Sequence, residues 1–360
     1  MSSSHPTQRR AQRPKWSRSP LPLMGAIVVL IGVIGAAGVL RAADARTAEV
    51  ERIDGLGAVL AAVPSGDGVL ADGQIVTYPA ENYLLVGSDS REGLAEGADS
   101  QVIGGTDDVG GRRSDTIMVL RQERDGGASL MSIPRDLWVP IAGTGGSGRI
   151  NEAYAEGPER LAATVTEALG IPIHHYVEVN FQGFKDIIDR LGGVDLCVDA
   201  EARDTHSGLS ISAGCQRLDG LQALAYARSR YYQTWTGEEW QTDGRADLGR
   251  IERQQFFIRS AVNGALAQIQ SSPFSSGNTI SAIVSALRID DQLDPIEAAQ
   301  ALRQAFQTGL RTFALPVYND TVGNAQILRM GDSADALLAY FRGDAPAPVE
   351  FETTAVTQTG

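Results

Sequence analysis

The chain has 360 residues, a net charge of −13, 43% apolar residues and two cysteines. With 21% charged residues as well, this composition is that of a folded protein with a substantial core and excludes a disordered chain. The charge is unevenly distributed. Residues 1–41 carry six basic residues and no acidic one, and subtracting these from the total leaves −19 on residues 42–360. Because so acidic a body repels a phosphate backbone, we expect no binding to nucleic acid.

An uncharged run of twenty residues, LPLMGAIVVLIGVIGAAGVL, occupies positions 21–40. As a helix it would be roughly 30 Å long, which matches the hydrocarbon core of a bilayer. The basic segment 1–20 before it is typical of a cytoplasmic flank, so the run is expected to be a transmembrane signal anchor. The alternative is a cleaved signal peptide, because small residues suited to a peptidase lie at 36–37, within the run, and at 42–43, just after it. Both interpretations place residues 42–360 outside the cell, and the first makes the protein a single-pass protein of the cell membrane.

Export determines how the two cysteines are interpreted. Cys197 and Cys215 would lie outside the reducing cytoplasm, where one intramolecular disulfide is expected. Such a bridge closes a loop of about 18 residues and contributes about 3 kcal/mol in the chain-entropy description. Two free buried thiols are the alternative. Neither cysteine is part of a CxxC motif, so neither a zinc site nor a redox motif is indicated.

The elements expected after the membrane segment begin with a stalk. Residues 42–62 alternate charged and apolar positions with few breakers, which predicts a helix, and a Gly/Pro/Asp linker extends this stalk region to residue 78. Strands are expected at 82–87, 116–120, 128–133, 176–179, 194–198 and 312–316. Helices are expected at 154–169, 181–191, 221–228, 248–269, 295–308 and 334–341. This alternation predicts a single α/β domain over residues 79–345 with helices on both faces of the sheet, followed by a disordered tail at 346–360.

Arginines lie at the ends of the expected strands and in helices that begin near them. They are Arg91, Arg113, Arg135, Arg228, Arg230, Arg250 and Arg253. In open α/β sheets the ligand site lies at strand ends. A single guanidinium group can donate two parallel hydrogen bonds to two oxygens of a phosphate. Each arginine alone is most simply a solvated surface charge. As a set they suit a pyrophosphate, and Gln254 shares one helix face with Arg250.

Carboxylates are interleaved with these arginines. Asp89 follows the first strand of the domain, and Asp115 comes two residues after Arg113. Hard oxygen ligands beside phosphate-binding groups are how proteins usually hold Mg²⁺. Taken singly, each aspartate is more commonly a turn former or a helix cap.

Seven motifs in this order resemble the LytR-CpsA-Psr family of cell-wall enzymes. They are NYLLVGSDSR (82–91), RRSDTIMVL (112–120), SIPRDLWVPI (132–141), RINEAYAEG (149–157), YVEVNFQGFKDIIDRLGGVDLCVD (176–199), LDGLQALAYARSR (218–230) and DLGRIERQQ (247–255). The resemblance covers residues 81–258 and implies a single α/β/α sandwich with a mixed central sheet and a hydrophobic tunnel for a lipid. The cysteine pair and the arginine-rich usage are similar to the actinobacterial branch.

The resemblance implies a phosphotransferase that moves a glycan-1-phosphate from a polyprenyl-pyrophosphate carrier to peptidoglycan, at the 6-hydroxyl of muramic acid. The transferred polymer would be arabinogalactan, teichoic acid or capsule. Two alternatives stay open. One is a polyprenyl-pyrophosphate pyrophosphatase that uses the same site with water as acceptor. The other is a non-catalytic lipid-binding regulator of the envelope.

The same resemblance assigns roles to individual residues. Asp89 and Asp115 would hold Mg²⁺, or Mn²⁺ in its place, with Asp89 also the candidate base and Arg113 a further catalytic residue. The pyrophosphate would be bound by Arg91, Arg113, Arg135, Arg228, Arg230, Arg250 and Gln254. Ile187, Ile188, Leu191 and Phe257 would line the lipid tunnel, with ordinary core packing as the alternative. An insertion rich in glycine and acidic residues separates Arg91 from Arg112, so the geometry between Asp89 and Asp115 is inferred across it.

Overall fold

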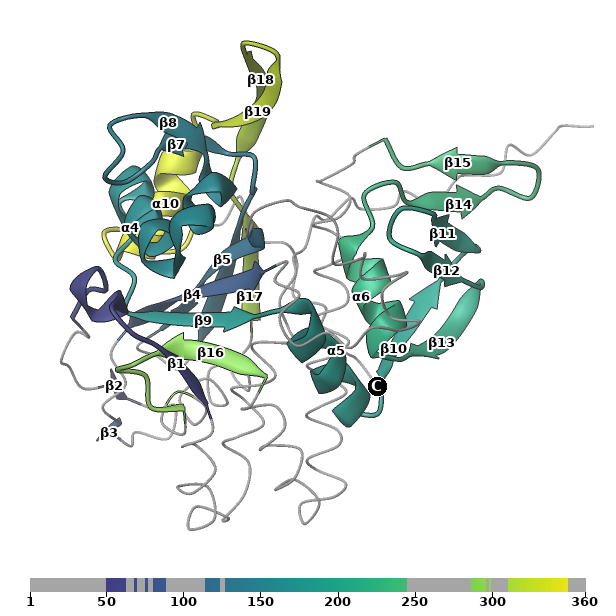
Figure 1. Cartoon of the computed structure of the whole chain (residues 1–360), viewed down its shortest axis with the longest axis horizontal. Coiled ribbons are helices and arrows are strands. Elements are labelled where there is room, and N and C mark those ends of the chain that lie inside the picture. The colour runs from purple at the N-terminus through teal and green to yellow at the C-terminus, as the bar shows by residue number, and fades with distance from the viewer. Residues whose placement is uncertain are drawn as a thin grey trace, which may run out of the picture.

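A seven-stranded sheet is the centre of the protein (Figure 1). The computed structural model describes residues 50–62, 68–69, 75–76, 80–88, 114–123, 127–244, 286–295, 298 and 310–348. In spatial order the strands are β1 (Glu51–Ile53), β16 (Leu287–Asp290), β9 (His175–Val179), β4 (Glu81–Ser88), β5 (Ser114–Gln122), β6 (Ala128–Ile133) and β17 (Leu310–Ala314). Pairs β4–β9, β6–β17 and β1–β16 are parallel, and β4–β5, β5–β6 and β9–β16 are antiparallel. The expected mixed α/β architecture with a mixed central sheet is confirmed.

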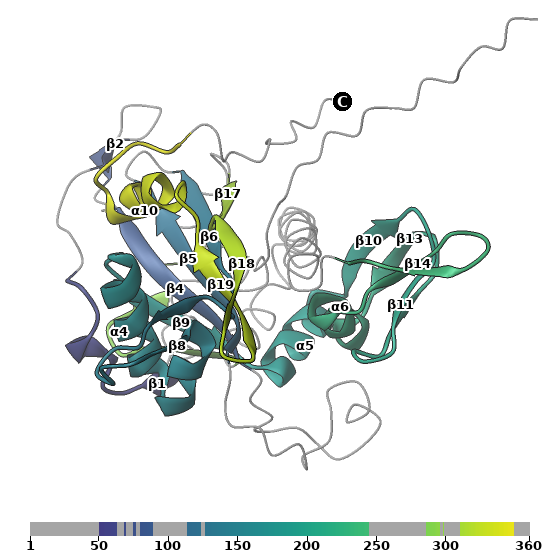
Figure 2. The same cartoon turned by 90° about the horizontal axis from the view of Figure 1, so that it is seen from above.

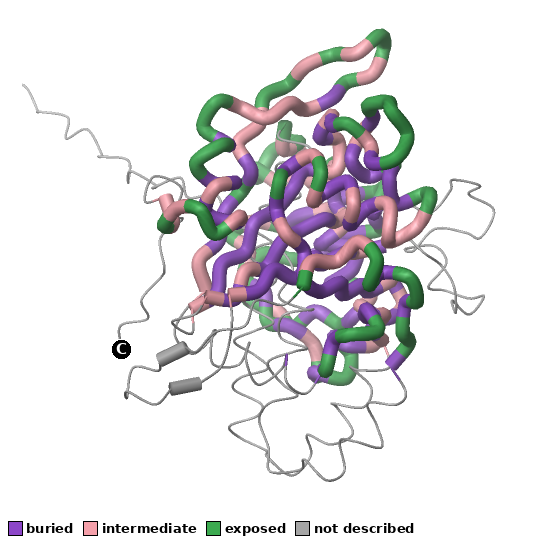
Figure 3. The backbone as a smooth tube through the Cα atoms, turned by 90° about the vertical axis from the view of Figure 1, so that its left-hand side faces the viewer, coloured by how far each residue is buried: buried purple, intermediate pink, exposed green. Residues whose placement is uncertain are grey.

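Both faces of this sheet are buried, which explains the continuous apolar runs of its central strands (Figure 3). Side chains alternate across a strand, so Tyr83 and Leu85 of β4 belong to one core cluster, and Leu84 and Val86 belong to the other. Each cluster is covered by different elements. We call the two sides the helical face and the lobe face.

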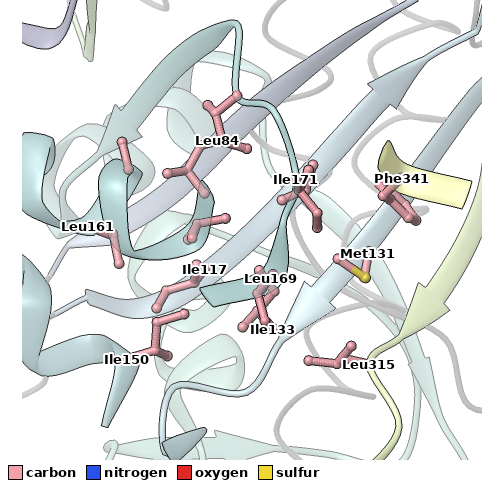
Figure 4. Packing of buried hydrophobic residues seen from close by; sticks show 14 of the residues in the cluster. Leu84, Ile117, Met131, Ile133, Ile150, Leu161, Leu169, Ile171, Leu315 and Phe341 are labelled. Carbon is pink, nitrogen blue, oxygen red and sulfur yellow. The ribbon is translucent and has the colours of Figure 1, made fainter. Parts of the chain in front are cut away.

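The helical face is covered by the 3₁₀ helix η2 (Ile150–Glu156), by α4 (Pro158–Leu169) and by α10 (Ala334–Arg342). Leu161 of α4 and Phe341 of α10 are fully buried against strand residues such as Ile117 (Figure 4). Gly170 ends α4 in the left-handed conformation, which glycine adopts without strain. The result is a closed apolar core.

The lobe face is covered by residues 181–244, which we call the lobe (Figures 1 and 2). It contains α5 (Phe181–Arg190), α6 (Gly220–Arg228) and the antiparallel pair β10 (Val194–Val198) and β13 (Gly214–Leu218). A four-stranded sheet completes it, in the order β12 (Leu209–Ile211), β11 (Ala202–Asp204), β14 (Gln233–Trp235), β15 (Trp240–Thr242). A side chain at Gly220 would clash with the Lys185 carbonyl, so glycine there lets α6 pack directly on the backbone of α5.

Shorter elements complete the described part of the chain. They are η1 (Leu56–Ala58), β2 (Gly68–Val69) with β3 (Ile75–Val76), β7 (Trp138–Pro140) with β8 (Ser147–Arg149), and β18 (Val317–Val322) with β19 (Ala325–Met330). The β18–β19 hairpin projects from the body at the top of Figure 1.

Three expectations about secondary structure differ from the structure. Instead of a helical stalk, residues 51–58 form strand β1 and a 3₁₀ turn, because Ile53 and Leu56 are buried against the sheet and β1 pairs with β16. The helix expected from residue 154 begins at Pro158, because Gly157 separates it from η2. The strand expected at 312–316 runs from 310 to 314.

Parts of the expected organisation lie outside the described residues. These are the apolar run at 21–40, the helix at 248–269 and nearly all of the helix at 295–308. Across the ranges that the structure describes, no helix is both long and apolar enough to cross a membrane.

Candidate functional site

Four strands of the central sheet meet at one edge, which we call the site edge. β4 ends there at Ser88, β9 at Val179 and β6 at Ile133, while the antiparallel β5 begins there at Ser114. Ser88 is paired with Ser114, and Gly87 with Val179. The carboxyl ends of parallel strands are where α/β sheets bind ligands.

A bulge places Asp115 at this edge. Gly87 pairs with Thr116 and Ser88 with Ser114, so the register shifts and Asp115 is the extra residue on β5. Bulges of this kind are frequent beside active sites. Asp89 follows Ser88 directly in the sequence but lies outside the described residues, and for Asp115 only the backbone is described.

Arg135 reaches the site edge from a third strand, two residues after the end of β6. Its Nε lies 3.5 Å from Oδ2 of Asp136, whose other oxygen is 3.4 Å from Nε of Arg149. The Arg135 carbonyl accepts a hydrogen bond of 3.2 Å from the Asn151 backbone N–H. Two of the quoted motifs therefore hold this turn in place, and the pairing of β6 with β5 puts it beside the strand that carries Asp115.

Arg228 arrives from the lobe. It is the last residue of α6, and its guanidinium carbon lies 4.5 Å from the ring centroid of Phe181. Phe181 opens α5 immediately after β9, and the Asn180 side chain caps that helix by accepting from the Gly183 N–H at 2.7 Å. A cation stacked on a ring is held without losing its charge. Arg228 is thus fixed beside the end of β9, at the site edge.

Arg230 is held by a residue that sequence reasoning missed, Asp204 of β11. The Asp204 carboxylate is fully buried, and Oδ2 accepts hydrogen bonds from Ser229 Oγ at 2.7 Å, Arg230 N at 3.0 Å and Tyr231 N at 2.9 Å. Its Oδ1 accepts a further bond of 2.8 Å from the His206 backbone. Burial opposes ionisation, yet these donors lower the pKa of Asp204 below its usual value. A charged anchor therefore fixes the segment that carries Arg230.

A second buried carboxylate supports β9 close to its end. Glu178 accepts hydrogen bonds from the Tyr154 hydroxyl at 2.6 Å and the Tyr176 hydroxyl at 2.9 Å, and pairs with Arg288 at 3.1 Å. Burial and the Glu178 charge raise the pKa of both tyrosines above the usual value. Burial opposes the charge on Arg288, but Glu178 and Glu51 raise the pKa of Arg288. Both tyrosines therefore stay protonated and keep donating to Glu178.

The expected disulfide is confirmed. Cys197 and Cys215 are directly paired residues on β10 and β13 and are joined by a bond of 2.05 Å. The bridge joins the two strands of this antiparallel pair, and β13 leads directly into α6, so the bridge supports the helix that ends in Arg228.

The residues proposed for the lipid tunnel lie in the core of the lobe face. Ile187 and Ile188 are completely buried and Leu191 is nearly so. Their contact with a lipid stays a prediction. The remaining expected site residues lie outside the described residues, and they are Arg91, Arg113, Arg250, Gln254 and Phe257.

The described side chains include no group of three or more His, Cys, Asp or Glu residues that could hold a metal ion. His174 and His175 make buried polar contacts instead. Nδ1 of His174 accepts the Asn82 backbone N–H at 2.9 Å, and His175 lies between Glu81 and Asp290. The expected metal pair, Asp89 and Asp115, falls where side chains are not described.

Comparison with known proteins gives consistent results. The LytR_cpsA_psr (LytR-CpsA-Psr) family matches residues 73–339. A Corynebacterium glutamicum protein named probable cell wall biosynthesis protein LcpB is 35% identical over 274 residues, covering 75% of this chain and 63% of that protein. A Bacillus cereus protein named polyisoprenyl-teichoic acid–peptidoglycan teichoic acid transferase TagU is 39% identical over 183 residues, 50% of this chain and 51% of that protein. The chain thus matches less than two thirds of the length of each.

The fold has a solved counterpart as well. The structure titled LytR-Csp2A-Psr enzyme from Actinomyces oris superposes with a TM-score of 0.61 at 25% identity, covering 81% of this chain and 95% of that one. With the motifs in order, the sheet topology in agreement and the family match spanning most of the sequence, the chain belongs to the LytR-CpsA-Psr family.

Proposed function

We propose that the protein transfers a glycan-1-phosphate from a polyprenyl-pyrophosphate carrier to the muramic acid 6-hydroxyl of peptidoglycan. The observation that carries the proposal is the convergence on one sheet edge of the Asp115 bulge, Arg135 and Arg228, which come from three separate parts of the chain. The names of the TagU and LcpB relatives support the same chemistry and the same cellular setting.

The reaction is a displacement at the phosphorus that carries the glycan. The acceptor hydroxyl oxygen forms a bond to this phosphorus, the bond to the polyprenyl phosphate breaks, and polyprenyl phosphate leaves with the electron pair. The hydroxyl proton passes to a base, for which we propose Asp89. Arg135, Arg228 and Arg230 neutralise charge on the phosphoryl oxygens, and phosphoryl transfer depends mainly on such positioning and neutralisation.

We propose that this edge also holds a divalent cation. Asp89 and Asp115 offer hard oxygen ligands, and Asp115 sits at a bulge beside the strand end that precedes Asp89. Mg²⁺, or Mn²⁺, held by these two residues would supply further neutralisation of the pyrophosphate charge.

We further propose that residues 21–40 anchor the chain in the cell membrane, with the basic segment inside and the catalytic domain outside. This arrangement gives the site edge access to a lipid-linked donor in the membrane and to peptidoglycan beyond it. Ile187, Ile188 and Leu191 lie in the core that the lipid chain would enter.

The decisive assay supplies purified protein with Mg²⁺, radiolabelled lipid-linked glycan and peptidoglycan sacculi. We expect label to become bound to the wall. Label released as soluble glycan phosphate would instead indicate a pyrophosphatase, and label that stays on the lipid would contradict both enzymatic functions.

The assay has a matched pair of variants. Arg228→Ala is expected to lower the transfer rate by about 10²–10³, the usual cost of removing one preorganised charge-stabilising group. Arg217→Ala is the control, because Arg217 is an exposed arginine of the same lobe that forms a surface ion pair with Asp195 at 2.7 Å. Equal rates in the two variants would contradict the assignment of Arg228 to the site.

A further inference from the structure

Among the described residues, one face of the four-stranded sheet of the lobe lies outside the hydrophobic core. Strand pairing places Ala202, Leu209 and Ile211 on its inner face, where they are buried in the lobe-face core. The opposite face carries a set of half-buried or exposed side chains. They are Arg203, Ser210, Gln233, Trp235, Trp240 and Thr242. We call this set the outward face.

The outward face is built in a fixed arrangement. Trp235 and Trp240 are cross-strand partners with ring centroids 5.4 Å apart. The guanidinium carbon of Arg203 lies 4.0 Å from the Trp240 centroid, and its Nε donates to Oε1 of Gln233 at 2.9 Å. The amide of Gln233 in turn donates to Thr242 Oγ1 at 3.1 Å. Side chains held this way lose little entropy when a ligand binds.

The chemistry of this face suits a sugar. A pyranose or furanose ring presents C–H groups to an indole ring and hydroxyl groups to amide, hydroxyl and guanidinium partners. Tryptophan offers a large apolar surface and one polar N–H, which makes it effective at half-exposed binding surfaces. The face continues toward the start of β14 with Tyr231, which is 56% exposed and stacks on His206 with ring centroids 4.2 Å apart.

The outward face and the segment that carries Arg230 are connected through neighbouring residues of the chain. Arg203 and Asp204 are adjacent on β11: Arg203 contributes to the outward face, and Asp204 anchors the backbone of Arg230. Trp235 lies five residues beyond Arg230, which is about 16 Å along an extended chain. The outward face therefore lies near the segment that carries Arg230.

We propose that the outward face binds the glycan chain of the lipid-linked donor, beyond the sugar attached to the pyrophosphate. The donor is favoured over peptidoglycan because only the donor glycan is covalently joined to the phosphate that Arg228 and Arg230 would hold. The inference rests on the proposed transferase function and specifies how its substrate is recognised.

The test compares two donors in the full-length protein. One is a polyprenyl pyrophosphate that carries a single sugar. The other is the same lipid carrying a wall-polymer oligosaccharide isolated from the envelope of the source organism. Trp235→Ala is expected to raise KM about tenfold for the long donor, as loss of an aromatic contact residue typically does, and to leave KM for the short donor unchanged. Equal effects on both donors would overturn the proposal.

Two further variants separate recognition from folding. Arg203→Met keeps an apolar side chain beside Trp240 but removes the hydrogen bond to Gln233, and it is expected to affect the long donor alone. Tyr318→Ala is the control, because Tyr318 is 52% exposed on the distant β18–β19 hairpin. A KM change for the long donor in Tyr318→Ala equal to that in Trp235→Ala would overturn the assignment.

Direct binding keeps the test independent of turnover. Calorimetry with lipid-free wall oligosaccharide should show binding to the wild type that is about tenfold weaker in Trp235→Ala. If neither donor is turned over, the proposed function fails while this titration still decides the role of the outward face. Binding of soluble muropeptides that is lost in Trp235→Ala, without binding of the wall oligosaccharide, would overturn the assignment to the donor.

Discussion

The two faces of the central sheet are covered in different ways. On the helical face, η2, α4 and α10 close over strand side chains such as Leu84 and Ile117 and form a closed apolar core (Figure 4). On the lobe face, α5 and α6 bring Arg228 to the sheet edge, and the lobe adds a second sheet with aromatic and polar side chains outside. One face provides a rigid support, and the other carries the groups that we expect to bind the substrate.

The largest expected effect comes from a matched pair of core truncations, one on each face. Ile171→Ala on the helical face and Ile188→Ala on the lobe face each remove a fully buried isoleucine. Both should lower the free energy of unfolding by about 2–5 kcal/mol, measured by denaturant titration. Only Ile188→Ala should also change how KM depends on the polyprenyl chain length of the donor. A similar change in Ile171→Ala would remove the functional distinction between the faces.

The disulfide should stabilise the lobe face. Replacing Cys197 and Cys215 by serine removes a bridge whose ends are 18 residues apart, which should cost about 3 kcal/mol of unfolding free energy. Hydrogen exchange should rise first in β10 and β13 and remain low in α4 and α10. Uniform loss of protection in both regions would mean that the two faces unfold as one unit.

Asp204→Asn should affect transfer more than folding. The substitution replaces the oxygen that accepts hydrogen bonds from Ser229, Arg230 and Tyr231 with an amide NH₂ group, which cannot accept them. The lost hydrogen bonds should lower the free energy of unfolding by about 1–3 kcal/mol and let the Arg230 segment shift. We expect kcat to fall about tenfold while KM for the acceptor stays constant. Asp195→Asn, in an exposed ion pair with Arg217, is the control. If the transfer rate fell only in proportion to the melting temperature in both variants, Asp204 would have a structural role and no role in positioning Arg230.

The smallest expected effect is a pH dependence of the free energy of unfolding, caused by His174 on the helical face. Burial, together with His175 and Arg121, lowers the pKa of His174 to about 4, against 6.5 for the unperturbed group. In that window the unfolded chain binds a proton that the folded chain does not, so stability falls as the pH drops from 6.5 toward 4. His174→Gln should flatten this decline in the midpoint of denaturant unfolding. An unchanged slope would show that other groups cause it.

Much of the site was predictable because its residues occupy motifs that follow strands. Arg135 follows strand β6 and Arg228 ends helix α6, as the predicted elements place them, and their binding of the substrate stays a prediction. Asp204 was not predictable, because its donors at 206, 229, 230 and 231 come together only when β11 packs beside the end of α6. β1 was missed for a similar reason, since its partner β16 lies more than 230 residues away.

The sequence by itself determined the family, the alternation of strands and helices, and the cysteine pair, because periodicity, glycine stops and ordered motifs are local properties. Only the tertiary structure decided which residues meet at the site edge, how the bulge places Asp115, and that Arg203 and Asp204 serve opposite faces of one strand. These features depend on register and burial between distant segments. No local pattern encodes them, because the favourable energy of each contact arises only when both partners leave water together.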